Sequence, residues 1–176
     1  MKKVYGMGFN DCPNKSNTPQ YIRWASMIQR CYDLEALKRD PSYMDTYVCL
    51  EWLRFSTFSA WMDTCAWEGK CLDKDLSGEN YYSPETCLWV SPELNKYWTG
   101  ARGSGLAGAN YEADRGKWKA SLKMPGPGGK KRTLGRYTTE QEAHEVYMKE
   151  KIKNLSYFLT SESPEVVKRL QELIDG

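Results

Sequence analysis

The stretch LDKDLSGENYYSPETCLWVSPELN, residues 72–95, organises the fold that we expect for this chain of 176 residues. It begins with two acids that flank a lysine, Asp73, Lys74 and Asp75, and it crosses a turn rich in Gly and Asn before an apolar run at residues 88–90. This order predicts a strand, a turn and then a strand or helix, with charged groups at the first bend. Such carboxylates suit a divalent cation, and they equally suit an exposed polar turn with nothing bound.

The order LDKD, loop, YSPETC, apolar run and SPELN resembles the core of the His-Me finger (HNH) endonucleases. It resembles more closely a group of small phage-encoded HNH-like proteins. The resemblance implies a site for Mg²⁺ or Mn²⁺ with Asp73 and Asp75 as metal ligands and Cys87 on or beside the ligand position of the helix. It also implies that Asp73, Lys74 and Asp75 are the catalytic residues, with Lys74 at the position of the catalytic histidine.

Three features depart from a working HNH site. Lys74 can act as a general base only if its pKa falls by several units, and the two acids beside it act in the opposite direction. Cys87 is a soft ligand that suits Mg²⁺ poorly. The single histidine, His144, lies far along the chain in a predicted helix. The sequence therefore leaves two alternatives open, a metal-dependent DNA endonuclease and a DNA-binding protein that has lost nuclease activity.

Composition indicates a globular protein with a sizeable core, since 40% of the residues are hydrophobic and 13% are aromatic. No apolar run is long enough to span a bilayer, and the N-terminal residues lack the apolar segment of a signal peptide. We therefore expect a soluble protein of the cytoplasm, which for a phage-encoded protein is that of the host cell. The six cysteines form no CxxC pair, so reduced and mostly buried thiols are expected rather than a zinc site.

Helices are predicted at residues 19–32 and 53–64, with a short strand at residues 47–50 between them. Their aromatic stripes resemble the scaffold of the same phage HNH-like group. The seven tryptophans and twelve tyrosines of the chain suit a core, and they also suit an interface. A third alternative is therefore a phage accessory protein that binds and inhibits a host protein.

Positive charge is concentrated in one segment, although the net charge of the chain is only +2. Residues 102–136 carry nine Lys or Arg and two Asp or Glu, whereas the segments on either side are net negative. Such a basic segment is where a polyanion docks.

A three-stranded sheet and a helix are predicted for residues 108–160. Apolar residues at 118, 120, 122 and 124 alternate with Lys119, Ser121 and Lys123, which is typical of a strand with one buried face. Thr139 and Glu142 form a capping box, from which a helix runs towards Phe158. We therefore expect a sheet with one apolar face under the helix and one lysine-rich face open.

This segment resembles the AP2-type DNA-binding domain through Gly108, GKWKA at residues 116–120, LGRY at 134–137, TEQEA at 139–143 and Tyr147. The resemblance implies that double-stranded DNA is the partner and that the lysine-rich face enters the major groove. Strand register decides which side chains face the groove. The candidate DNA-contact residues are Arg102, Tyr111, Arg115, Lys117, Lys119, Lys123, Lys131, Arg132 and Arg136.

The expected fold is α+β. A helical and ββα-like module related to HNH occupies residues 1–98, and a Gly- and Ser-rich linker occupies residues 99–107. An AP2-like three-stranded antiparallel sheet packed on one helix follows at residues 108–160. An amphipathic C-terminal helix, capped by Ser163, occupies residues 161–176. The sequence leaves the oligomeric state open.

Overall fold

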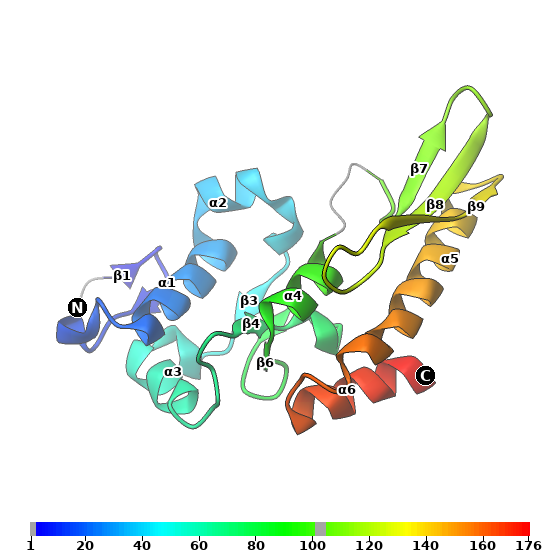
Figure 1. Cartoon of the computed structure of the whole chain (residues 1–176). Coiled ribbons are helices and arrows are strands. Elements are labelled where there is room, and N and C mark those ends of the chain that lie inside the picture. The colour runs from blue at the N-terminus through cyan, green and yellow to red at the C-terminus, as the bar shows by residue number, and fades with distance from the viewer. Residues whose placement is uncertain (1–2, 101–104) are drawn as a thin grey trace. The chain divides into compact units, whose positions relative to one another are not determined.

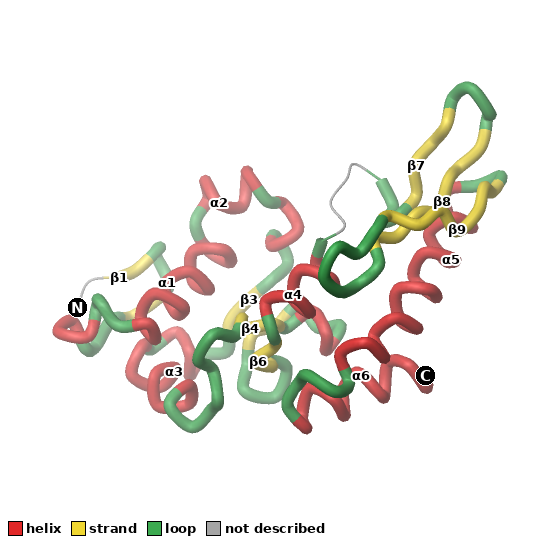
Figure 2. The backbone as a smooth tube through the Cα atoms, viewed as in Figure 1, coloured by secondary structure: helices red, strands yellow, loops and turns green. Residues whose placement is uncertain are grey.

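The computed structural model of the chain describes residues 3–100 and 105–176 (Figure 1). The chain divides into two compact units, one that ends at Trp89 and one that begins at Val90. Both units contain helices and short strands, so the expected α+β class is confirmed (Figure 2).

The first unit combines helices with three two-stranded sheets. β1 pairs antiparallel with β2, β3 pairs parallel with β5, and β4 pairs with β6. The helices are α1 (Pro19–Tyr32), α2 (Leu34–Arg39) and α3 (Phe55–Met62), and 3-10 turns lie at Pro13–Lys15, Pro41–Tyr43, Glu51–Leu53 and Asp75–Ser77. The strands are β1 (Lys3–Val4), β2 (Gly8–Phe9), β3 (Tyr47–Val48), β4 (Cys71–Asp73), β5 (Tyr81–Tyr82) and β6 (Leu88–Val90).

Helix α1 has the bounds predicted from the sequence, and two features stabilise its start. The Thr18 side chain accepts a hydrogen bond from the Tyr21 N–H, and Pro19 takes the first helical position. The second predicted helix is shorter than expected. The N–H groups of Trp52 and Leu53 donate to the carbonyl of Cys49, so a 3-10 turn separates β3 from α3.

Aromatic side chains fill the core of the first unit. Trp24, Trp52, Phe55 and Phe58 are almost fully buried, and the indole N–H of Trp24 donates to the carbonyl of Trp52 at 2.7 Å. A buried indole needs such a partner for its one donor. These aromatic residues therefore build the scaffold, and they are not available to an external partner.

The second unit is a three-stranded antiparallel sheet in the order β7-β8-β9, with α5 in contact with all three strands (Figure 1). The predicted capping box of α5 is present, because Thr139 Oγ1 accepts from the Glu142 N–H while the Glu142 carboxylate accepts from the Thr139 N–H. The elements are α4 (Pro92–Thr99), β7 (Ala109–Glu112), β8 (Lys117–Lys123), β9 (Lys131–Tyr137), α5 (Glu140–Lys153), a 3-10 segment (Asn154–Phe158) and α6 (Pro164–Asp175).

Helix α4 groups with the second unit, although the sequence assigns it to the first module. The Tyr97 hydroxyl donates to the carbonyl of Lys151 at 3.1 Å, and the Lys151 Nζ donates to the carbonyl of Trp98 at 2.6 Å. These two hydrogen bonds tie the end of α4 to the end of α5.

The C-terminal helix α6 packs within the second unit through Val166 and Leu170, which are buried. Ser163 lies at its N-cap position, but the serine side chain makes no capping hydrogen bond. The helix begins at Pro164 as expected, but the predicted capping hydrogen bond from Ser163 is not formed.

Gly108 allows α5 to approach the sheet closely. Its φ is +78°, and an added Cβ would lie 2.0 Å from the Cγ of Tyr147. Only glycine fits both the backbone conformation and the space that the tyrosine ring occupies.

Candidate nucleic-acid interface

Strand register determines the two faces of the β7–β9 sheet, because residues directly opposite in an antiparallel ladder point to the same side. Ala109, Ala120 and Gly135 lie opposite one another, and Ala120 is fully buried where α5 packs. This row belongs to the helix face. The open face carries Asn110, Glu112, Lys117, Lys119, Ser121, Lys123, Lys131, Thr133 and Arg136.

A β-bulge in β9 sets which basic residues reach the open face. The register passes from Ala120 opposite Gly135 to Ser121 opposite Thr133, so Leu134 is an extra residue on β9. Beyond the bulge, Lys131 lies opposite Lys123 on the open face, and Arg132 lies opposite Leu122 on the helix face. The sequence contains no signal that fixes this shift.

Glu112 neutralises part of the positive charge of the open face. Its carboxylate binds the Lys119 Nζ and the Arg136 Nε, the latter at 2.6 Å. The hydrogen bonds from Arg136 and Lys119 lower the pKa of Glu112 to about 2. The carboxylate is therefore ionised throughout the neutral and mildly acidic range.

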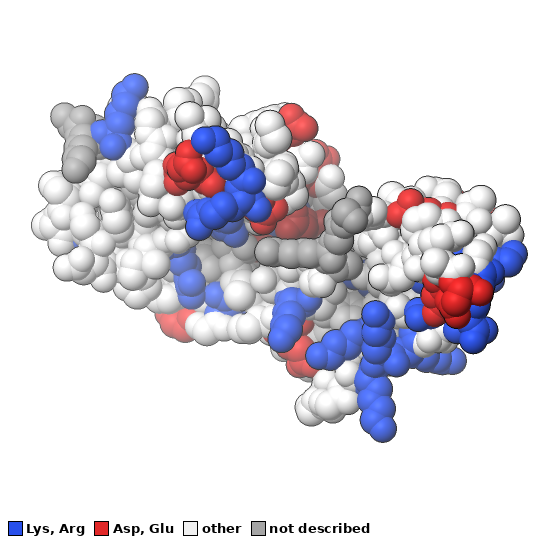
Figure 3. Space-filling view, turned by 90° about the horizontal axis from the view of Figure 1, so that it is seen from above, with Lys and Arg blue, Asp and Glu red and all other residues white. Residues whose placement is uncertain are grey.

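Lys117, Lys123 and Lys131 are exposed cations of this face, as is Arg136, which is paired with Glu112. The Lys117 Nζ donates to the hydroxyl of Thr138 at 3.3 Å, and none of the three lysines makes an ion pair within the described residues. Figure 3 shows Lys and Arg side chains of the second unit gathered around a small acidic group.

Four further candidates lie away from the open face or outside the described residues. Tyr111 is opposite Trp118 on the helix face, and the two ring centroids are 5.2 Å apart. Arg132 points to the same side and lies 3.9 Å from a Glu150 carboxylate oxygen on α5. Arg115 lies in the β7–β8 turn, 3.5 Å from Asp114. Arg102 falls outside the described residues.

Asp73, predicted as a catalytic residue and metal ligand, ends β4 as a buried carboxylate. Its Oδ1 accepts from the Leu76 N–H at 2.9 Å, and its Oδ2 is buried without a hydrogen-bond partner among the described residues. Burial raises the pKa of Asp73 to about 6. A buried carboxylate oxygen without a partner is able to accept a proton or a cation.

Lys74 is buried between two tyrosines. Its Nζ lies 5.7 Å from the ring centres of Tyr43 and Tyr82 and 2.6 Å from the Asp75 Oδ1. The Arg30 guanidinium lies over the same two rings. Two cations and two aromatic rings thus form a cluster in the interior of the first unit.

Asp73, Asp75 and Cys87 fit a site for Mg²⁺ or Mn²⁺ poorly. Asp75 is already paired with Lys74, and burial raises the pKa of the Cys87 thiol to about 12. A protonated thiol is not a ligand for a hard cation. Across the described part of the chain, no group of three or more His, Cys, Asp or Glu side chains is arranged to hold a metal.

Two features of the second unit escaped sequence reasoning. Lys151 is only 4% exposed. It lies four residues after the buried Tyr147, so it belongs to the buried stripe of α5 although it is a charged residue. Ser121 is 5% exposed although it occupies a polar position of β8. Helical periodicity indicates the burial of Lys151, whereas nothing in the sequence indicates the burial of Ser121.

Comparison of the chain with models of protein families, with curated proteins and with solved structures gives no match. Among the described residues, no helix has the length and apolar character needed to cross a membrane.

Proposed function

We propose that the protein binds double-stranded DNA through the open face of the β7–β9 sheet. The observation that carries the proposal is the register, which directs Lys117, Lys119, Lys123, Lys131 and Arg136 to one face with a single carboxylate among them. A cluster of this kind neutralises phosphates and releases counterions.

The dimensions of the sheet suit the major groove. Strands lie about 4.8 Å apart, so three strands span roughly 10 Å between the outer backbones. The major groove of B-form DNA is about 12 Å wide. Lys117, Lys123 and Lys131 are exposed on the open face. This face can therefore enter the groove and place its cations near the phosphates.

A salt titration tests this proposal. We expect the affinity for a labelled duplex, measured by fluorescence anisotropy, to fall steeply with salt, and Lys117→Gln and Arg136→Gln each to reduce the slope of log affinity against log salt by about 1. Lys168→Gln, a change of an exposed lysine on α6, is the matched control and should leave the slope unchanged. Salt-independent binding, or equal slopes for all variants, would contradict the proposal.

The geometry favours binding without cleavage by the Asp73–Lys74–Asp75 sequence. Asp73 and Lys74 are 3% and 4% exposed, so a scissile phosphate cannot touch them without a rearrangement of the first unit. We expect supercoiled plasmid to be shifted by the protein, in a protease-sensitive way, and to stay uncut with EDTA, Mg²⁺ or Mn²⁺. Metal-dependent nicking that Asp73→Ala abolishes would establish the endonuclease alternative instead.

A further inference from the structure

Helix α4 is attached to the rest of the second unit near both of its ends. Near its start, the Glu93 carboxylate accepts from the Gly126 N–H at 3.0 Å, and Gly126 lies in the loop that joins β8 to β9. Near its end, the Tyr97 hydroxyl donates to the carbonyl of Lys151 on α5. The side chains between these two attachments therefore have a defined place beside the sheet.

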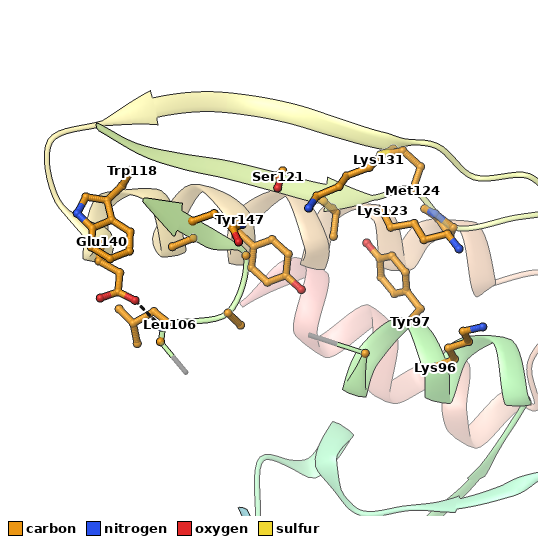
Figure 4. A pocket seen from close by; sticks show the side chains of 18 of the residues that line it. Lys96, Tyr97, Leu106, Trp118, Ser121, Lys123, Met124, Lys131, Glu140 and Tyr147 are labelled. Atoms are coloured by element: carbon orange, nitrogen blue, oxygen red, sulfur yellow. Dashed lines mark hydrogen bonds between the residues drawn. The ribbon is translucent and has the colours of Figure 1, made fainter. Parts of the chain in front are cut away.

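Lys96 lies between the two attachments, and its side chain is exposed. Figure 4 shows Lys96 of α4 with Lys123 of β8 and Lys131 of β9 at one end of a pocket of the second unit. Lys123 and Lys131 are directly opposite each other in the sheet. The basic residues of the sheet thus continue onto α4, which lies outside the segment at residues 108–160 that resembles AP2.

Positive charge at this end of the sheet has no matching carboxylates. None of Lys96, Lys123 and Lys131 makes an ion pair within the described residues, and residues 115–139 contain no Asp or Glu. Glu93, one turn before Lys96, accepts the hydrogen bond from Gly126. Like charges directly opposite in a ladder repel each other, so a polyanion beside these three lysines would be stabilising.

The length of β8 separates these lysines from the basic residues at the other end of the sheet. The strand begins at Lys117 and ends at Lys123. At about 3.3 Å per residue, roughly 20 Å lies between these two positions. Phosphates of one DNA strand follow one another about every 3.4 Å along the axis, so 20 Å corresponds to about six base pairs. Cations at the two ends of β8 therefore reach different phosphates.

We infer that Lys96 belongs to the DNA interface and contacts a backbone phosphate beside those reached by Lys123 and Lys131. The inference rests on the proposed function, and it adds a second element, α4, to the binding site. A phosphate contact carries no sequence information, but it fixes the orientation of the protein on the duplex. The attachments of α4 at Glu93 and Tyr97 hold Lys96 in place for this role.

Salt titration of the full chain with a labelled duplex, measured by fluorescence anisotropy, tests the inference. We expect Lys96→Gln to reduce the slope of log affinity against log salt by about 1, as the loss of one phosphate contact does. The double variant with Lys117→Gln should lose about 2, because the two contacts are distant and independent. Lys168→Gln, on α6, is the control and should leave the slope unchanged.

Chemical acetylation of the wild-type chain gives a measurement that needs no substitution. The rate of modification of each lysine by an N-hydroxysuccinimide ester of acetate is followed by mass spectrometry of peptides, with and without the duplex at low salt. We expect the duplex to slow acetylation of Lys96, Lys123 and Lys131 and to leave that of Lys168 unchanged.

An unchanged salt slope in Lys96→Gln, or acetylation of Lys96 that the duplex does not slow, would overturn the inference. Reduced slopes for Lys117→Gln and Arg136→Gln in the same experiments would show that the sheet binds DNA without α4. If these two variants also keep the slope of the wild type, the proposed function fails together with the inference.

Discussion

Lys151 is a cation held inside the second unit by aromatic rings. Its Nζ lies 4.9 Å from the ring centre of Trp98 and 5.4 Å from that of Tyr147, with the Trp98 carbonyl as acceptor. Burial lowers the pKa of Lys151 to about 8 from 10.5. Between these values the unfolded chain binds more protons than the folded one, so the contribution of this residue to stability rises with pH.

We expect the stability of Lys151→Met, relative to wild type, to be greatest at neutral pH and to decline by about 1.4 kcal/mol per pH unit between roughly pH 8 and pH 10. Urea unfolding across this range measures the difference. Lys153→Met, which changes an exposed lysine of the same helix, should show no such decline. A difference that is independent of pH would mean that Lys151 is not titrating as its burial predicts.

Asp73 imposes the opposite pH dependence on the first unit. Its folded pKa of about 6 exceeds the usual 3.8, so the folded chain binds more protons in this window and stability is lost as pH rises through it. We expect Asp73→Asn to be more stable than wild type by about 3 kcal/mol at neutral pH, with the gain vanishing below pH 4. The asparagine Oδ1 keeps the hydrogen bond from Leu76.

Asp75→Asn provides the contrast, because it leaves the buried Lys74 without its counter-charge and should be destabilising. Guanidinium unfolding of both variants at several pH values compares them. A less stable Asp73→Asn at neutral pH would show that the ionised carboxylate has a stabilising partner, such as a cation.

At the scale of elements, the contact of Gly108 with α5 predicts a specific loss of stability. In Gly108→Ala, the new methyl group would overlap the Tyr147 ring at a backbone conformation that already favours glycine, and we expect destabilisation of roughly 3 kcal/mol or more. Gly116→Ala is the matched control. It has a φ of +59° but nothing within 4 Å of the added Cβ, so it should cost only about 1 kcal/mol. Thermal unfolding of both variants measures the difference. Similar losses of stability in the two variants would contradict the close approach of Tyr147 to Gly108.

Sequence reasoning succeeded where one local signal determines an element. Pro19 at the first helical position and Thr139 with Glu142 indicate the starts of α1 and α5, and both helices begin as predicted. It failed at Ser121 and Arg132, because their burial and direction depend on the pairing of strands and on a bulge. The buried state of Asp73 and Lys74 likewise depends on the tyrosines that surround the lysine, which come from separate segments of the chain.

For the whole molecule, the boundary at Trp89 and Val90 predicts which fragment carries DNA binding. Residues 91–176 contain the Ser91 cap of α4, whose N–H donates to the Glu162 carboxylate, together with α6. We expect this fragment to fold and to bind duplex DNA with the salt dependence of the full chain. Residues 108–160, the segment that resembles AP2, lack α4 and the buried Val166 and Leu170, and should be markedly less stable.

Circular dichroism melting and anisotropy compare these fragments. Equal stability of the two would mean that α4 and α6 are accessory to the sheet, and an unfolded fragment of residues 91–176 would mean that the second unit depends on the first.

The bulge at Leu134 determines which charged residues of β9 lie on each face of the sheet. In a strictly alternating strand, Lys131 and Thr133 would share the side of Tyr137, and Arg132 would share that of Arg136. The extra residue inverts this parity for every position before it, so identical amino acids with one fewer bulge would exchange a lysine for an arginine on the exposed surface. The insertion or deletion of one residue in β9 would therefore change which residues lie on the exposed face, although the other side chains stay the same.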